Sequence, residues 1–142
     1  MKRTNKPPSL EDIFGPVIVS YSRAQALEEG VLVDATPLAK DAGFQWPVAL
    51  TRAVWEDCVT WTETDNHRQA YQDQTGRLWD LLFMAAMTIR AHKGKGNQLP
   101  LTLRRVPRDG RSTRAEDVTL KMLVGPGDHG EPVITILQPQ ED

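Results

Sequence analysis

The stretch GRLWDLLFMAAMTIRAHKG, residues 76–94, places the strongest constraint on the fold. It is apolar almost all round between Leu78 and Ile89, which is typical of a helix buried against several neighbours. Gly94 is a natural helix terminator. Positive charge is favourable at a helix C-terminus, and three basic residues lie there: Arg90, His92 and Lys93. The apolar block LLFMAAM is far too short to span a bilayer. The sequence therefore predicts one long buried helix and no membrane partner.

The last third of the chain is predicted to be β-structure. The stretches 99–106, 117–124 and 132–137 alternate or run apolar, and clusters of Gly, Pro and Asp separate them. Short connections favour antiparallel neighbours. We expect a three-stranded antiparallel β-meander packed on the helix at 76–93, and hence an α+β domain.

Two short helices are predicted near the N-terminus from their end signals. Residues 22–30 begin with Ser22, which is followed three residues later by Gln25 in a capping-box pattern, and Gly30 ends the helix.

The second short helix is predicted over residues 36–43. Thr36 is the expected N-cap, Pro37 occupies the first helical position, and Gly43 terminates the helix.

Simpler patterns describe the other segments of the first half. Residues 17–21 and 31–34 have the composition of short strands. Residues 47–59 suit a third helix, in which Thr51 is an alternative N-cap. The polar stretch 60–75 is expected to be a loop.

Composition bounds the class of protein. The chain has 142 residues, of which 39% are hydrophobic and 25% charged, with a net charge of -2, as in an ordinary globular domain. We expect a single α+β domain over residues 11–142 after a disordered polar tail at 1–10. The single cysteine, Cys58, excludes an internal disulfide and a cysteine-built zinc site, so a reducing cytoplasm is the natural setting.

The loop sequence GPGDHGEP, residues 125–132, resembles a phosphate-binding loop only in its glycines. A phosphate-binding loop needs Lys followed by Ser or Thr, and then a helix, whereas Glu131 and Pro132 follow the last glycine here. The pattern favours a hairpin between two strands. Asp128 and His129 at its tip are candidates for recognition, since loops on rigid strands often carry function.

Basic residues are concentrated between residues 90 and 121, which hold nine Lys and Arg against three Asp and Glu. Such a segment suits contact with a phosphate backbone, although no DNA-binding motif or interleaved aromatic residues accompany it. The nucleic-acid candidates are Lys93, Lys95, Arg104, Arg105, Arg108, Arg111 and Arg114.

No catalytic constellation, cofactor motif or metal-ligand spacing is present in the sequence. Cys58 lies on the apolar face of its predicted helix, which indicates a structural thiol. If Asp80, inside the apolar helix, is buried, it requires a partner such as Arg77 or an arginine of the meander, and a structural ion pair is favoured over a catalytic acid. An enzyme hypothesis requires four residues to meet in space: Asp34, Asp80, Asp128 and His129.

Four tryptophans are many for a chain of this length. Trp55 and Trp79 fall in helical apolar patterns and are expected in the core. Trp46 and Trp61 flank the predicted helix at 47–59 and are expected to be partly exposed. Exposed tryptophan favours a protein interface, because tryptophan is enriched at binding hot spots.

Four blocks of the sequence match, in order, a family of small bacterial proteins without an assigned activity. The blocks are YSRAQALEEGVLVDAT, AGFQWPVALTRAVWEDCV, GRLWDLLFMAAMTIR and VTLKMLVGPGDHGEPVITI. The chain resembles this family over most of residues 13–138. Members are met largely on plasmids, in phages and in other mobile elements. The resemblance implies work in the bacterial cytoplasm and an accessory role, and it supplies no ligand or catalytic residue.

Three functional hypotheses follow. The first is a non-enzymatic module, a monomer or weak homo-oligomer, that binds a protein partner. The second is an accessory protein that binds nucleic acid through residues 90–114. The third is a small enzyme built from the four polar residues named above.

Overall fold

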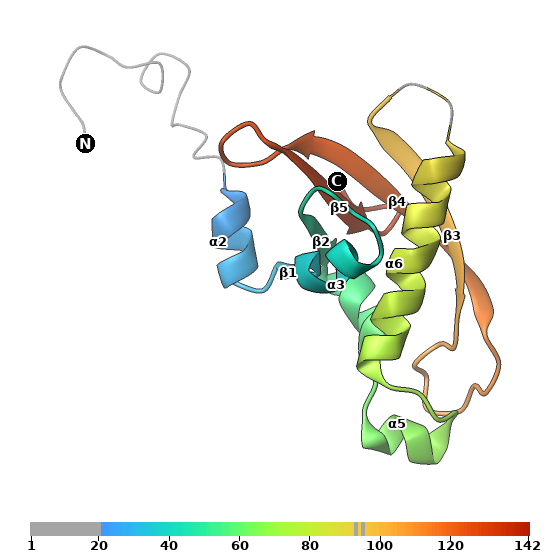
Figure 1. Cartoon of the computed structure of the whole chain (residues 1–142). Coiled ribbons are helices and arrows are strands. Elements are labelled where there is room, and N and C mark those ends of the chain that lie inside the picture. The colour runs from blue at the N-terminus through green and yellow to red at the C-terminus, as the bar shows by residue number, and fades with distance from the viewer. Residues whose placement is uncertain (1–20, 93, 95) are drawn as a thin grey trace, which may run out of the picture.

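The computed structural model describes residues 21–92, 94 and 96–142. They form an α+β structure in which helices cover a five-stranded sheet (Figure 1). The strands are β1 (Leu32–Asp34), β2 (Val48–Thr51), β3 (Gln98–Arg105), β4 (Glu116–Pro126) and β5 (Pro132–Leu137). The helices are α2 (Arg23–Glu28), α3 (Thr36–Asp41), α4 (Arg52–Val54), the π-helix η1 (Trp55–Val59), α5 (Glu63–Arg68) and α6 (Gln74–Ala91). The predicted tail at 1–10 lies outside the described residues, as does the predicted strand at 17–21 except for Tyr21.

The three C-terminal strands are confirmed as antiparallel neighbours, but the predicted sheet was too small. The strand order is β1-β2-β5-β4-β3, and β2 pairs parallel with β5. The meander therefore forms one part of a mixed sheet, which continues beyond β5 through the antiparallel pair of β2 and β1.

The prediction of a helix over 47–59 was wrong in its first part. Val48, Ala49 and Leu50 are at most 1% exposed, because β2 lies inside the sheet and has side chains buried on both faces. A strand of this kind reads as a continuous apolar run, which periodicity does not separate from a buried helix. Thr51 is confirmed as the N-cap of the following helix, since its Oγ1 accepts from the backbone N–H of Val54.

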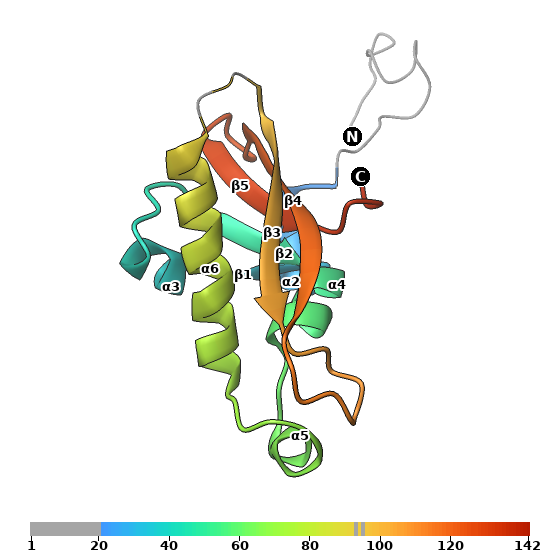
Figure 2. The ribbon, with the colours of Figure 1, turned by 90° about the vertical axis from the view of Figure 1, so that its right-hand side faces the viewer.

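Helix α6 is confirmed, although it is not buried all round. Its N-cap is Asp73, whose Oδ1 accepts from Gly76 N, and its C-cap is His92. One side packs on the sheet and on η1. Figure 2 shows α6 and α3 on the same side of the sheet. The buried residues of α6 are Arg77, Leu78, Leu81, Leu82, Ala85 and Ala86.

The predicted loop at 60–75 contains a helix, α5. Thr62 and Asp65 form a capping box in which each side chain bonds the other residue's backbone N–H. This signal was missed because the third helical position holds Asp, whereas the usual capping box has Glu or Gln there.

The two N-terminal helices are confirmed with one correction. Ser22 caps α2 through its hydroxyl, which accepts from Gln25 N. Thr36, the expected N-cap of α3, is instead its first residue. Its hydroxyl donates to Asp34 Oδ1 and accepts from Val48 N, and so it ties α3 to β2.

No helix in the described part of the chain is both long enough and apolar enough to cross a membrane.

Candidate functional site

The solvent side of α6 carries a stripe of large apolar side chains. Trp79, Phe83 and Met87 follow one another at intervals of four residues, so they line one face of the helix. Their exposed fractions are 37%, 46% and 44%, and the adjacent Met84 is 38% exposed. We call these four residues the α6 stripe. Contiguous exposed apolar side chains are typical of interaction surfaces.

A cavity of about 460 Å³ opens beside the C-terminal half of α6. Its lining is mostly apolar and comes from the segment 43–46, from α6 and from the sheet. Trp46 stands in this lining at 43% exposure. Arg90, three residues after Met87, is also part of the lining. The cavity therefore adjoins the end of the α6 stripe. The other apolar lining residues are Phe44, Ala86, Ile89, Leu99, Val124 and Ile134.

The backbone before Trp46 is fixed by its neighbours. Gly43 has φ of 104°, and an added Cβ there would lie 2.8 Å from Nη2 of Arg90. The chain then joins the sheet, because the carbonyl of Pro47 accepts from Ile134 N at 2.9 Å. Phe44 is buried at 8% exposure. Trp46 is thus presented outward from an anchored segment, as its sequence position predicted.

The sequence missed the stripe residues on α6. Trp79 was expected in the core and is exposed, and the exposure of Phe83 and Met87 was not expected. A signal was present, because an all-round apolar pattern has two physical causes: burial on every side, or an apolar face left for a partner.

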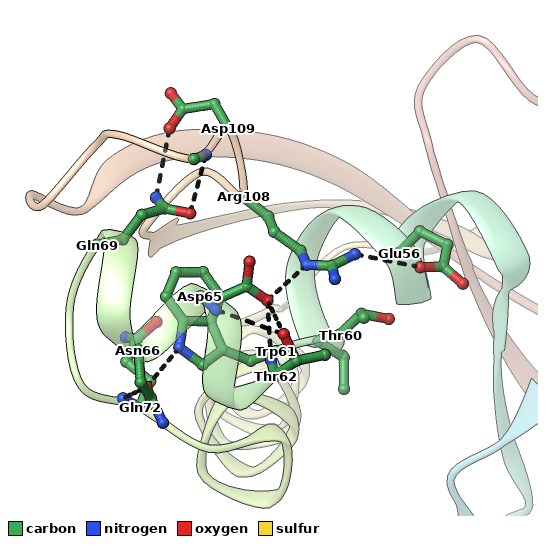
Figure 3. Close-up of polar contacts among 12 residues, drawn as sticks. Glu56, Thr60, Trp61, Thr62, Asp65, Asn66, Gln69, Gln72, Arg108 and Asp109 are labelled. Carbon is green, nitrogen blue, oxygen red and sulfur yellow. Dashed lines mark hydrogen bonds and ion pairs between the residues drawn. The ribbon is translucent and has the colours of Figure 1, made fainter.

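A polar network joins α5 to the segment between β3 and β4 (Figure 3). Asp65 Oδ2 accepts from the backbone N–H and hydroxyl of Thr62 and from Arg108 Nε, the last at 2.8 Å. Burial alone raises the pKa of a carboxyl, but the hydrogen bonds from Arg108 and Thr62 outweigh it and hold the pKa of Asp65 below its usual value.

Gln69 fastens the same segment further along. Its Nε2 donates to the carbonyls of Pro107 and Ser112, and its Oε1 accepts from Gly110 N. Asp109 accepts from the hydroxyl and backbone N–H of Ser112 and from Arg111 N, and these bonds lower the pKa of Asp109 to about 2. Hydrogen bonds made by Gln69 and Asp109 therefore connect this segment to α5 and within itself.

Trp61, expected to be partly exposed, is buried at 5% exposure. Its indole Nε1 donates to Asn66 Oδ1 at 2.8 Å, and the guanidinium of Arg77 lies over its ring. The prediction was wrong because α5, which sequence periodicity did not reveal, covers the indole. Trp61 is a structural residue.

The candidate arginines are largely engaged in ion pairs. Arg104 pairs with Asp117 at 3.3 Å and Arg105 with Asp57 at 3.2 Å, while Arg108 meets both Asp65 and Glu56. Among the described residues, Arg111 and Arg114 are exposed and have no carboxylate within 4.0 Å. Lys93 and Lys95 lie outside the described residues.

The loop at 125–132 is a hairpin connection between β4 and β5, as predicted. Asp128 accepts from Arg23 N at 2.7 Å and from Ala24 N at 2.9 Å. These bonds, that from Ala24 first, lower the pKa of Asp128. Asp128 therefore caps α2 from across the fold, and His129 beside it is exposed.

The four residues of the enzyme hypothesis do not share a described cavity. Asp128 lines a cavity between α2 and the sheet, and Asp80 lines a smaller one beside η1. Asp80, which required an ion-pair partner only if buried, is exposed and has no described ion pair. Asp34 is also exposed and bonds Thr36.

Cys58 is buried, as predicted, at 1% exposure. Burial, together with the neighbouring Asp57, raises the pKa of its thiol to about 12. The described residues contain no group of three or more His, Cys, Asp or Glu side chains that could hold a metal ion.

Comparison with known proteins identifies a family but no activity, ligand or partner. No curated protein matches the chain. No solved structure matches it either. A family model matches residues 13–142, which is nearly the whole chain. The chain belongs to the family described as a family of unknown function (DUF6573).

Proposed function

We propose that this protein is a non-enzymatic interaction module that binds a protein partner through the α6 stripe and the cavity beside Trp46. The observation that carries the proposal is the exposure of Trp79, Phe83 and Met87 along a single helix face. The first and last of these residues are eight positions apart, a span of about 12 Å at 1.5 Å per residue. This length matches two turns of a helix lying against α6.

The partner that fits this surface is an amphipathic helix from a different protein. Its apolar face would cover the stripe, and one bulky apolar side chain would enter the cavity. Arg90 lies where the stripe meets the cavity, and no described carboxylate lies within 4.0 Å of it. An acidic residue near one end of the partner helix would pair with Arg90.

The biological setting proposed here is an accessory role in the bacterial cytoplasm, in association with mobile elements. The support is the resemblance of the four sequence blocks. The composition, with one buried cysteine, agrees with a reducing compartment.

Nucleic-acid binding through residues 90–114 is the second candidate. Its support is the exposure of Arg111 and Arg114 without carboxylate partners. It is weakened by the ion pairs of Arg104, Arg105 and Arg108. A guanidinium that is paired with a carboxylate has less net charge and fewer N–H donors available to a phosphate. A mobility-shift assay at low salt tests it, and the lack of any shift excludes it.

A differential capture experiment tests the first proposal. Tagged wild type, Phe83→Asp and Tyr71→Asp are each expressed in the native host and purified with bound proteins. Tyr71 is 87% exposed and precedes α6, so its change controls for an added surface charge. The proposal expects one protein to accompany wild type and Tyr71→Asp at similar yield and to be lost from Phe83→Asp.

Sedimentation of the purified variants separates a foreign partner from a second copy of this chain. Concentration-dependent dimerisation of wild type that Phe83→Asp abolishes would assign the stripe to self-association. Equal capture of the same protein by all three variants would contradict the proposal.

A further inference from the structure

A small cavity of about 130 Å³ lies between the N-terminal half of α6 and the end of β3. Two arginines from these elements, Arg77 and Arg105, form part of its wall, together with Arg104, Asp80 and the buried Cys58. The cavity is independent of the α6 stripe, since none of the stripe residues lines it.

Arg77 is a buried cation without a direct counterion. Only 4% of the residue is exposed. Its four hydrogen bonds go to neutral acceptors: Gln72 Oε1 and the backbone carbonyls of Val59, Val106 and Asp57. No carboxylate among the described residues lies within 4.0 Å of its guanidinium. A buried charge in this state is costly unless another group compensates it.

Arg105 lines the same cavity and has an unsatisfied hydrogen-bond donor. Its side chain is 15% exposed, and its Nη2 contacts both carboxylate oxygens of Asp57 at 3.2 Å. Its Nε–H is buried without an acceptor, which is true of no other side-chain N or O atom in the described part of the protein. Such orphaned donors are uncommon in native proteins and point to a water or ion.

Together these two guanidinium groups meet one close carboxylate, that of Asp57. These three groups together retain one positive charge, and the wall adds Asp80 and Arg104, whose charges are opposite. The cavity is larger than one water needs and far smaller than pockets for organic ligands, which run to about 300 Å³ or more. From this size and charge we infer that the cavity binds a tetrahedral oxyanion, a phosphate or sulfate group, between Arg77 and Arg105.

The chemistry of the wall agrees with this ligand. Guanidinium groups are the usual partners of phosphate oxygens; here Arg105 offers its unsatisfied Nε–H, whereas Arg77 contributes mainly charge, since four of its N–H donors are already bonded. Arg104 lies on the exposed side, with its Nη2 held by the carbonyl of Ala115. Asp80 also lines the cavity, and its negative charge opposes the binding of an anion. Neutralising Asp80 is therefore expected to tighten oxyanion binding.

The first experiment follows the full-length protein during titration with sodium phosphate, with sodium chloride at equal ionic strength as the control. The Nε–H signals of the arginines are recorded by ¹H–¹⁵N NMR, and Arg105→Gln assigns the signal of Arg105. Phosphate is expected to shift this signal in a saturable way that chloride does not reproduce. An Arg105 signal that does not shift at high phosphate concentration overturns the inference. This result does not depend on whether any variant binds phosphate.

Matched variants give the second test, by calorimetric titration with phosphate. Arg105→Gln is expected to weaken binding about tenfold or more, and Asp80→Asn to tighten it about threefold or more. Arg114→Gln, which removes an exposed charge outside the cavity, is expected to leave affinity unchanged. Equal losses in Arg105→Gln and Arg114→Gln would overturn the site.

A final arm identifies the source of the oxyanion. A short single-stranded oligonucleotide is added to the phosphate-saturated protein. Displacement of phosphate from Arg105 assigns the site to a nucleic-acid phosphate, whereas an unchanged Arg105 signal assigns it to a free anion. Both results support the oxyanion site.

Discussion

The guanidinium carbon of Arg77 lies 4.4 Å from the centre of the Trp61 indole ring. The same guanidinium bonds the carbonyls of Val59 and Val106. One side chain of α6 therefore joins the end of η1, the end of β3 and the tryptophan beneath α5.

Replacing Arg77 with Met tests that role. The change keeps most of the side-chain volume but leaves two buried carbonyls without their donor. We expect the free energy of unfolding to fall by about 2–4 kcal/mol. Urea denaturation measures it, with the exposed Arg114→Met as a control expected within about 0.5 kcal/mol of wild type. Equal effects of the two changes would show that the cation–π and carbonyl contacts carry little stability.

Asp65 links stability to acid pH. Its folded pKa is lowered by Arg108 and Thr62, so its contribution is present above the unfolded pKa and is lost as pH falls through the folded pKa. We expect Asp65→Asn to cost roughly 1–3 kcal/mol at pH 7 and to flatten the decline in stability below about pH 4. Unfolding curves from pH 7 to pH 2 measure this. The exposed Asp41→Asn is the control, and parallel curves for Asp65→Asn and wild type would contradict the role.

The thiol of Cys58 is expected to be inert in the native protein. With a pKa of about 12, only about one part in 10⁴ is thiolate at pH 8, and the sulfur is buried. Reaction with a disulfide reagent at pH 8 should follow unfolding and become fast in urea. A fast reaction in the native state that urea does not accelerate would contradict the burial of this thiol.

Substitutions at two adjacent residues of α6 distinguish a residue that stabilises the fold from one that is proposed to bind a partner. Leu82 is fully buried and Phe83 is 46% exposed. Leu82→Ala is expected to destabilise the protein by about 2–5 kcal/mol, whereas Phe83→Ser should change stability by no more than about 0.5 kcal/mol. Thermal or urea unfolding measures both. A loss from Phe83→Ser as large as that from Leu82→Ala would mean that the stripe serves the fold itself.

The sequence predicted correctly those elements whose ends are marked by local signals, such as helix caps and turn residues. Ser22 and Thr51 cap helices, and the turn residues at 125–132 join two strands. β2 was misassigned because its apolar run satisfies helix and strand patterns alike, and only pairing with β5, more than 80 residues later, decides between them. Trp61 was misjudged because the neighbouring helix α5, which covers it, was not predicted. Phe83 was misjudged for a related reason. Burial of a side chain depends on which distant segment covers it, and that information lies in the tertiary contacts.

The same limit applies to the candidate site. The exposure of Trp46 was predicted from its place beside the expected helix at 47–59 and is confirmed, whereas Arg77 and Arg105 were not connected to each other. Their shared cavity lies between α6 and the end of β3. This contact between distant segments cannot be predicted from the spacing of residues in the sequence.

The most direct measurement of the central claim is photo-crosslinking in the native host from position 83. A photoreactive phenylalanine analogue replaces Phe83 in one strain and Tyr71 in another, and adducts are resolved by mass spectrometry. The account predicts one dominant adduct from position 83, with a different protein, that is absent from position 71 and lost when Trp79 and Met87 are also changed to Ser. No adduct from position 83, or the same adducts from both positions, would contradict it.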